Sequence, residues 1–258
     1  MTERYRWADR WGLMPPSYYN RPGDEGFVEY VPMVDHKGRP MTWPALTEKG
    51  RQHYVECFGP HPRGSWLDPR EYPRNLQTWC QYLGLKRVTL VGAESTGKTY
   101  LGTELASHYE SILALEYGRE YTQRNNPSVW THEDMLKIAM GHIKRTALAA
   151  EHARQVLIED TDPLITAVWS DTLVGARDAW FEVFKDYADL YLLCDTDMPW
   201  VKDAIRYHGD PEERQRFQDA CETELVRRGV SFVRIQGDPE QRLTTAVQAI
   251  DQLLGLTP

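Results

Sequence analysis

The stretch VTLVGAESTGKT, residues 88–99, leads from a short apolar run into a loop with two glycines, and it decides the fold that the sequence predicts. Residues 92–99 match the pattern G-x-x-x-x-G-K-[ST] in full, and the backbone N–H groups of such a loop bind phosphate. The helix-compatible stretch YLGTELA, residues 100–106, follows, so the loop has the strand and helix context that the motif requires. The residues that we expect to bind the phosphates of a nucleotide are Gly92, Glu94, Ser95, Thr96, Gly97, Lys98 and Thr99.

Two side chains of this loop add chemistry that its backbone lacks. We expect the ammonium group of Lys98 to reach the β- and γ-phosphates and the hydroxyl of Thr99 to bind Mg²⁺. The helix that follows directs its positive N-terminal end at the same anion. The sequence therefore predicts an enzyme that uses ATP and Mg²⁺ as cofactors and transfers the γ-phosphate to a small hydroxylated acceptor.

Short apolar runs alternate with long helical stretches from residue 87 onward. The strands that we expect span residues 87–91, 112–115, 156–158, 189–194 and 230–235. The helices that we expect span residues 98–109, 132–154, 163–186, 199–228 and 239–254. Five short runs rich in Leu and β-branched residues predict an α/β fold of the P-loop NTPase and kinase type, with a five-stranded parallel sheet and helices on both faces.

Residues 1–86 differ in composition from the rest, and we expect them to form a separate N-terminal segment ahead of a P-loop kinase domain at residues 87–258. They hold five of the nine Trp and seven of the fourteen Tyr residues. The weakly alternating run at residues 27–34, followed by the turn-like DHKG, predicts a hairpin, and residues 47–58 predict a short helix. The role of this aromatic and proline-rich segment stays open.

The net charge of −8 is unevenly divided. Residues 1–87 carry +3, from 13 basic and 10 acidic side chains, and residues 88–258 carry −11, from 17 and 28. An acidic domain repels nucleic-acid phosphates, so only the N-terminal segment keeps nucleic-acid binding open. No apolar run is long enough to span a membrane, the N-terminus lacks a signal peptide, and the four cysteines are far apart. These features predict a cytoplasmic protein without membrane contact.

Three carboxylates, Glu159, Asp160 and Asp162, follow the apolar run at residues 156–158. In open α/β sheets, ligands bind at the carboxyl ends of the strands. Carboxylates crowded there would repel each other unless a cation or substrate hydroxyls compensated them. We therefore expect a catalytic or ribose-binding role for Asp160 or Asp162, with a solvated acidic turn as the alternative. Asp160 is our first choice to share Mg²⁺ with Thr99, but which aspartate serves the metal and which the acceptor stays open.

Basic side chains gather in residues 195–216, after the fourth expected strand. Small-molecule P-loop kinases close an arginine-bearing lid over ATP at this point in the chain. The candidates are Lys202, Arg206, Arg214 and Arg216, with Arg206 as the first choice for contact with the γ-phosphate. A salt-bridged helix face is the alternative, because acidic residues lie close by in the sequence.

Further stretches carry a resemblance to a known family: LEYGREY at residues 115–121, DTD at residues 160–162 and PWVKDAIR at residues 199–206. With the phosphate loop, they resemble the nicotinamide riboside kinase domain of NadR-type NAD-biosynthesis proteins. The similarity covers about residues 87–254, and the E-Y-G-R-E and D-T-D pair is its more specific part. The resemblance implies ATP-dependent phosphorylation of the 5′-hydroxyl of nicotinamide riboside, which gives nicotinamide mononucleotide.

The resemblance also implies roles for particular residues. Asp162 would hold the riboside hydroxyls or act as the base, and Glu116 and Arg119 would line the acceptor pocket. Tyr117 or Trp169 would stack on the nicotinamide ring, with ordinary core packing as the alternative for both.

Two other functions remain open at this point. Residues 1–86 lack the H-x-G-H-type motif of the adenylyltransferase domain that precedes the kinase in NadR-type proteins, so acceptor identity does not follow from the resemblance alone. The acceptor of the same kinase chemistry could instead be another nucleoside, or a hydroxyl on a modified base or end of a nucleic acid bound through the aromatic N-terminal segment. The second alternative is a nucleotide-dependent regulator or binding module, in which ATP turnover only switches the conformation of the protein. We expect a small-molecule partner first, and a homo-oligomer stays open.

Overall fold

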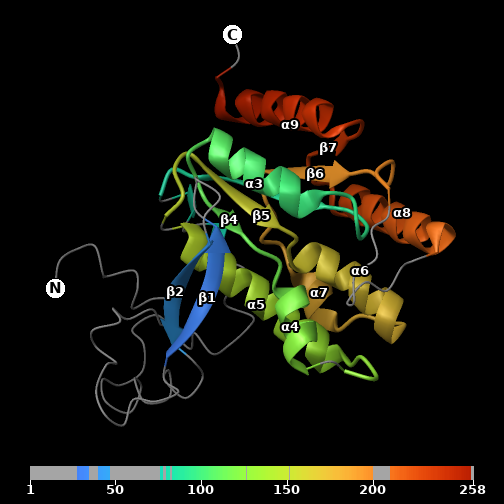
Figure 1. Cartoon of the computed structure of the whole chain (residues 1–258). Coiled ribbons are helices and arrows are strands. Elements are labelled where there is room, and N and C mark those ends of the chain that lie inside the picture. The colour runs from blue at the N-terminus through green and yellow to red at the C-terminus, as the bar shows by residue number, and fades with distance from the viewer. Residues whose placement is uncertain are drawn as a thin grey trace.

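A sheet with five parallel strands forms the centre of the fold (Figure 1). The structure is a computed structural model, and it describes residues 28–34, 40–46, 76–77, 80–81, 83–125, 127–150, 152–199 and 210–256. The parallel strands are β3 (Lys86–Val91), β4 (Leu113–Ala114), β5 (Val156–Asp160), β6 (Leu190–Cys194) and β7 (Phe232–Ile235). They lie in the order β4-β5-β3-β6-β7, so the strand that leads into the phosphate loop is the middle one. The predicted α/β fold with a five-stranded parallel sheet is confirmed.

Helices cover both faces of this sheet, as the apolar strands require. The helices are α3 (Lys98–His108), α4 (Tyr117–Asn125), α5 (His132–Ala150), α6 (Pro163–Val174), α7 (Ala179–Val183), α8 (Pro211–Arg228) and α9 (Pro239–Leu254). Alternate residues of a strand pack on opposite faces. Thus Leu90 packs in the core with residues of α3 and α9, whereas Val91 packs with residues of α6 and α8. Figure 1 shows α3 and α9 on one side of the sheet and α5 and α6 on the other.

Some predicted helix boundaries were wrong. The helix expected at residues 163–186 is two helices, because α6 ends at Gly175 with φ 84° and the side chain of Asp178 caps the start of α7. The helix expected at residues 132–154 ends at Ala150. The short polar helix α4 was not predicted, since only Tyr121 and Thr122 of its residues are buried and its apolar pattern is weak. The first part of the helix expected at residues 199–228 lies outside the described residues, and the described part begins at Pro211.

The predicted N-terminal hairpin is present. Strand β1 (Val28–Val34) pairs antiparallel with β2 (Pro40–Leu46), and Val34 pairs with Leu113 of β4. The hairpin therefore extends the sheet to seven strands, in the order β2-β1-β4-β5-β3-β6-β7. The helix expected at residues 47–58 lies outside the described residues, and the division into segments at residues 1–86 and 87–258 stays a prediction.

A buried ion cluster ties β3 to β5 beneath the site. Arg87, which is 1% exposed, contacts carboxylate oxygens of Glu159 and Asp186 at 2.7 Å each. Thr146 of α5 donates a further hydrogen bond to Glu159 at 3.1 Å. Buried charges are stable only when they are paired and hydrogen-bonded. The carboxylate of Glu159 therefore has a structural role, in which its partners are Arg87 and Thr146. Within the described parts of the chain, no helix is long and apolar enough to cross a membrane.

Candidate active site

The phosphate loop joins β3 to α3, and both of its glycines are required by its geometry. Gly92 has φ 128°, and a Cβ atom at this position would lie 2.4 Å from the carbonyl oxygen of Cys194. Gly97 has φ 79°, in the left-handed region that favours glycine. The loop therefore passes close to the end of β6 and turns directly into α3.

The two side chains predicted for phosphate and metal lie at this loop. Lys98 Nζ donates hydrogen bonds to the carbonyl oxygens of Gly92 at 3.0 Å and Ala93 at 2.7 Å. Thr99 Oγ1 donates to Asp160 Oδ2 at 2.6 Å. The neighbouring strands β3 and β5 bring this pair together, since Leu90 is in register with Asp160.

The residues at this position fit a magnesium ion. Asp160 Oδ1 is buried and has no hydrogen-bond partner, although Oδ2 is bonded to Thr99. Burial raises the pKa of Asp160, whereas the charge of Lys98 and the hydrogen bond from Thr99 act in the opposite direction. The described residues contain no group of three or more His, Cys, Asp or Glu side chains that could hold a metal. A hydroxyl and one carboxylate suit Mg²⁺, which takes its remaining oxygen ligands from phosphates and water.

Arg214 and Gln218 of α8 hold the loop from outside, and sequence analysis assigned neither of them this role. Arg214, considered as a lid residue, is buried and donates to the carbonyl oxygens of Glu94 at 3.0 Å and Ser95 at 3.1 Å. Gln218 Oε1 accepts a hydrogen bond from the amide of Ala93 at 2.9 Å. Because the same guanidinium also donates to the carbonyl oxygens of Thr196 and Met198 at 3.1 Å each, Arg214 braces the phosphate loop against the segment that follows β6.

Arg242 of α9 is a further brace that the sequence did not indicate. It donates to the carbonyl oxygens of Thr96 at 3.0 Å and Asp195 at 3.1 Å, and it pairs with the carboxylate of Asp197. These partners are separated by up to 146 positions in the sequence, so no local pattern links them.

The carboxylates that follow β5 face different surroundings. Asp162 is fully buried and caps α6, since its Oδ1 accepts from the amides of Leu164 at 3.0 Å and Ile165 at 3.3 Å. Its Oδ2 accepts from the hydroxyl of Tyr191 at 2.6 Å. Burial raises the pKa of Asp162 to about 6, although the hydrogen bond from Tyr191 lowers it. Of the three carboxylates predicted here, only Asp160 contacts the phosphate loop.

The backbone at Thr161 explains why Asp160 and Asp162 have different surroundings. Its φ of 71° lies in the left-handed region, which is a genuine outlier for a β-branched residue. A left-handed residue between Asp160 and Asp162 interrupts the alternation of the strand, so the two carboxylates have different partners. Such strain is concentrated at functional sites.

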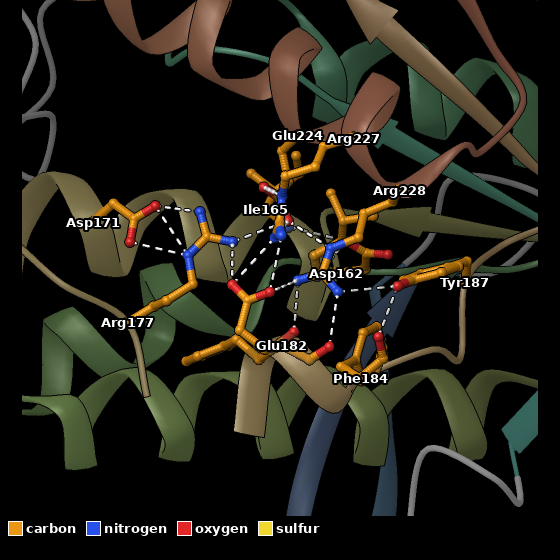
Figure 2. Close-up of polar contacts among 12 residues, drawn as sticks. Asp162, Ile165, Asp171, Arg177, Glu182, Phe184, Tyr187, Glu224, Arg227 and Arg228 are labelled. Atoms are coloured by element: carbon orange, nitrogen blue, oxygen red, sulfur yellow. Dashed lines mark hydrogen bonds and ion pairs between the residues drawn. The ribbon is translucent and has the colours of Figure 1, made fainter. Parts of the chain in front are cut away.

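An ion-pair network fixes α8 to the segment that contains α6 and α7 (Figure 2). Arg177 and Arg227 both pair with Glu182 and Glu224, and Arg228 donates to Glu224 at 2.7 Å. Burial would raise the pKa of Glu224, but hydrogen bonds from these three arginines lower it to about 2. Arg177 also pairs with Asp171 of α6, so the network links α8, which braces the phosphate loop, to both α7 and α6.

A cavity of about 280 Å³ opens beside the phosphate loop. It is lined by the loop and by residues of other elements, which include Glu116, Arg119, Thr161, His142 and Trp169. Burial and the charge of Asp160 raise the pKa of Glu116, whereas Lys98 and Arg119 lower it. The cavity thus combines phosphate-binding groups with a carboxylate, a guanidinium and an indole ring.

Some of the remaining predicted residues line this cavity and others do not. Trp169 lines it and packs on Phe217, with ring centroids 4.1 Å apart. Tyr117 and Asp162 are absent from its lining. Arg206 lies outside the described residues, so its lid role stays a prediction. His142 was not predicted because a single buried histidine on a helix has no distinctive sequence pattern.

Comparisons with known proteins identify the family and the relatives of this chain. A family described as an AAA domain matches residues 87–242, which is more than half of the chain. The trifunctional NAD biosynthesis/regulator proteins NadR of Escherichia coli strain K12 and Salmonella typhimurium strain LT2 are each 27% identical over 194 residues. That alignment covers 73% of this chain and 47% of each relative, so the chain spans about half the length of these curated relatives.

Two solved structures of NadR share the fold. One, in complex with NR, has a TM-score of 0.58 and 20% identity, and the match covers 71% of this chain and 57% of the NadR chain. The other, in complex with NAD and AMP-PNP, has a TM-score of 0.55 and 21% identity, and the match covers 70% of this chain and 52% of the NadR chain. These likenesses support the arrangement of strands and helices.

The sheet, the phosphate loop and the Thr99–Asp160 pair define the class of ATP-dependent P-loop phosphotransferases. Since the family match spans residues 87–242, the chain belongs to the AAA domain family of P-loop proteins. The resemblance to NadR-type proteins, expected from the sequence, is confirmed by these matches.

Proposed function

We propose that this chain is an ATP- and Mg²⁺-dependent kinase that phosphorylates the 5′-hydroxyl of nicotinamide riboside and gives nicotinamide mononucleotide. The observation that carries the proposal is the single cavity in which the phosphate loop meets Glu116, Arg119 and Trp169. One space of about 280 Å³ can hold the end of a triphosphate next to a small acceptor. Two observations support nicotinamide riboside as the acceptor: the similarity to two NAD biosynthesis/regulator proteins NadR, and the likeness to a solved NadR structure in complex with NR.

The loop residues account for binding and orientation of the donor. Backbone N–H groups of the loop and the start of α3 would bind the phosphates, and Lys98 would balance charge on the transferred group. Thr99 and Asp160 would hold Mg²⁺, which neutralises phosphate charge when it is bound. Arg214 and Arg242 hold the loop carbonyls, so the N–H groups need little reorganisation on binding.

Glu116 is the carboxylate that we assign to the acceptor hydroxyl. It lines the cavity, and it is close enough to Lys98 and Asp160 for their charges to affect its pKa. Asp162, by contrast, already accepts three hydrogen bonds and is fully buried. We therefore assign Asp162 to positioning α6 and Trp169, and not to proton transfer. Trp169 offers an apolar ring for contact with the base of the acceptor.

Acceptor identity can be tested directly with the purified full chain. ADP release is measured with ATP and Mg²⁺ alone, and then with nicotinamide riboside, nicotinic acid riboside, adenosine, uridine, thymidine or a 5′-hydroxyl oligonucleotide. We expect the highest kcat/KM with nicotinamide riboside, with product mass increased by one phosphoryl group. The Lys98→Ala variant is the control for contaminating kinases. The proposal would be refuted if turnover is highest with another nucleoside or with the oligonucleotide, or if no acceptor raises ADP release above its rate with ATP and Mg²⁺ alone.

A further inference from the structure

Tyr117 belongs to the E-Y-G-R-E stretch, but its surroundings differ from those of its neighbours. Glu116, Gly118 and Arg119 line the cavity, whereas Tyr117 does not. The Tyr117 ring lies against α5 instead. A Cβ atom built on Gly141 would lie 2.0 Å from Tyr117 Cδ1, so the ring occupies the space directly over this glycine.

A buried arginine of α5 also contacts the Tyr117 ring. The guanidinium carbon of Arg145 lies 4.9 Å from the centroid of the Tyr117 ring, within cation–π distance. The same guanidinium donates to the carbonyl oxygens of Leu115 at 3.2 Å and Glu116 at 2.7 Å, and it pairs with Glu120. With its side chain 3% exposed, Arg145 links the end of β4 to the first turn of α4.

A third residue of α5 faces the same turn. His142 Nδ1 accepts a long hydrogen bond, 3.5 Å, from the backbone amide of Tyr117. Burial lowers the pKa of His142 to about 3, so its ring is neutral and Nδ1 can accept. Gly141, His142 and Arg145, which we call the α5 cradle, therefore contact the ring, the amide and the flanking carbonyls of one short turn.

The cradle holds the start of α4, and a second contact with α5 lies farther along this helix, where the hydroxyl of Tyr121 donates to Asp134 at 2.6 Å. Helix α4 buries only Tyr121 and Thr122 among its own residues, and β4 is two residues long. Loss of the Tyr117 seat would therefore let the start of α4 shift. Displacement of a positioning group by about 1 Å can reduce turnover by about 10²-fold.

We propose that Tyr117 is a positioning residue whose ring, seated in the α5 cradle, sets the places of Glu116 and Arg119 in the acceptor half of the cavity. This inference rests on the proposed kinase function, since it assigns Glu116 and Arg119 to the acceptor. It replaces the expectation that Tyr117 stacks on the acceptor ring.

The test is a double-mutant cycle between Gly141 and Tyr117 in the full chain. Gly141→Ala places a methyl group in the space of the ring and should raise the acceptor KM by about tenfold, with the Kd for ATP alone unchanged. Tyr117→Ala should raise the acceptor KM to a similar extent. The double variant should be no worse than Tyr117→Ala, because the methyl group then has no ring to displace. Tyr117→Phe keeps the ring and should stay within about threefold of wild type.

Ile250→Ala is the control for a general loss of stability. Ile250 of α9 is fully buried in a core cluster that contains no residue of α4 or α5. This variant should lower the melting temperature without a selective rise in acceptor KM. A folded Gly141→Ala variant with wild-type acceptor KM, or fully additive effects in the cycle, would overturn the inference.

Hydrogen exchange separates this inference from the proposed function. In the ligand-free protein, Gly141→Ala should speed amide exchange selectively in residues 115–120, and Ile250→Ala should not. Unchanged exchange in residues 115–120 would refute the positioning role of Tyr117 even if nicotinamide riboside is phosphorylated. Absence of phosphorylation in the wild-type protein would refute the kinase proposal, whatever the exchange result.

Discussion

The phosphate half and the acceptor half of the cavity are built in different ways. Eight consecutive residues, 92–99, form the phosphate half, and side chains of α8 and α9 bond to their backbone. The acceptor half takes Glu116 and Arg119 from the turn after β4, and Trp169 from α6. Its turn is held by contacts with α5.

The difference reflects the chemistry of the two ligands. A polyphosphate can be bound by backbone N–H groups, which every residue but proline supplies, so geometry matters more than side-chain identity. A small acceptor is distinguished by the shape and polarity of side chains, which must come from several elements. We therefore expect changes in the phosphate half to affect every acceptor equally, and changes in the acceptor half to alter acceptor choice.

The largest effect should come from the phosphate half. Lys98→Ala removes the ammonium group that balances charge on the transferred phosphate, and kcat/KM should fall by at least about 10²-fold with any acceptor. Steady-state kinetics measure this, and a melting curve checks that the variant is folded. Near-normal turnover in a folded variant would mean that this half takes no part in the chemistry.

Asp160 and Asp162 provide the next comparison. Asp160→Asn should lower kcat by about 10²-fold and raise the Mg²⁺ requirement, because Asp160 contacts Thr99 beside the loop. Asp162→Asn should cost less than about tenfold, since an amide oxygen can still cap α6. Both are measured by kinetics across a Mg²⁺ titration. A folded but inactive Asp162→Asn variant would restore Asp162 as the base.

The braces of the loop should give a smaller effect that is confined to ATP. Arg214→Met removes the guanidinium that donates to Glu94 and Ser95, and the Kd for ATP should rise by about tenfold. The acceptor KM should change little. Arg154→Met is the matched control and should leave both values near wild type, because the Arg154 side chain is 64% exposed and pairs with Glu110. Equal effects of the two substitutions would argue against a specific brace.

The last effect concerns the pH dependence of stability and not catalysis. His142 has a pKa of about 3 in the folded protein, against about 6.5 in an unfolded chain. The unfolded state therefore binds more protons between these values, and stability falls as the pH drops below about 6.5. From pH 7 to pH 5, His142→Gln should lose about 2 kcal/mol less stability than wild type. Denaturant unfolding at both pH values measures this, and equal losses would contradict the buried neutral histidine.

The sequence predicted the strands and the phosphate loop, because each depends on a local pattern. It did not predict α4, whose polar residues have little apolar periodicity. It also merged α6 and α7, since Gly175 lies inside a stretch that otherwise favours a helix. A single glycine within a helical pattern is tolerated often enough that the break could not be inferred.

The sequence by itself determined where the phosphate loop lies, because two glycines, a lysine and a threonine at fixed spacing form a local pattern. Only the tertiary structure decided which carboxylate contacts this loop. The left-handed backbone at Thr161 separates Asp160 from Asp162, and the packing of α6 on Tyr191 occupies Asp162. The bracing arginine Arg242 and the seat of Tyr117 likewise depend on contacts between residues far apart in the chain. Such contacts arise from packing of whole elements, which no local pattern specifies.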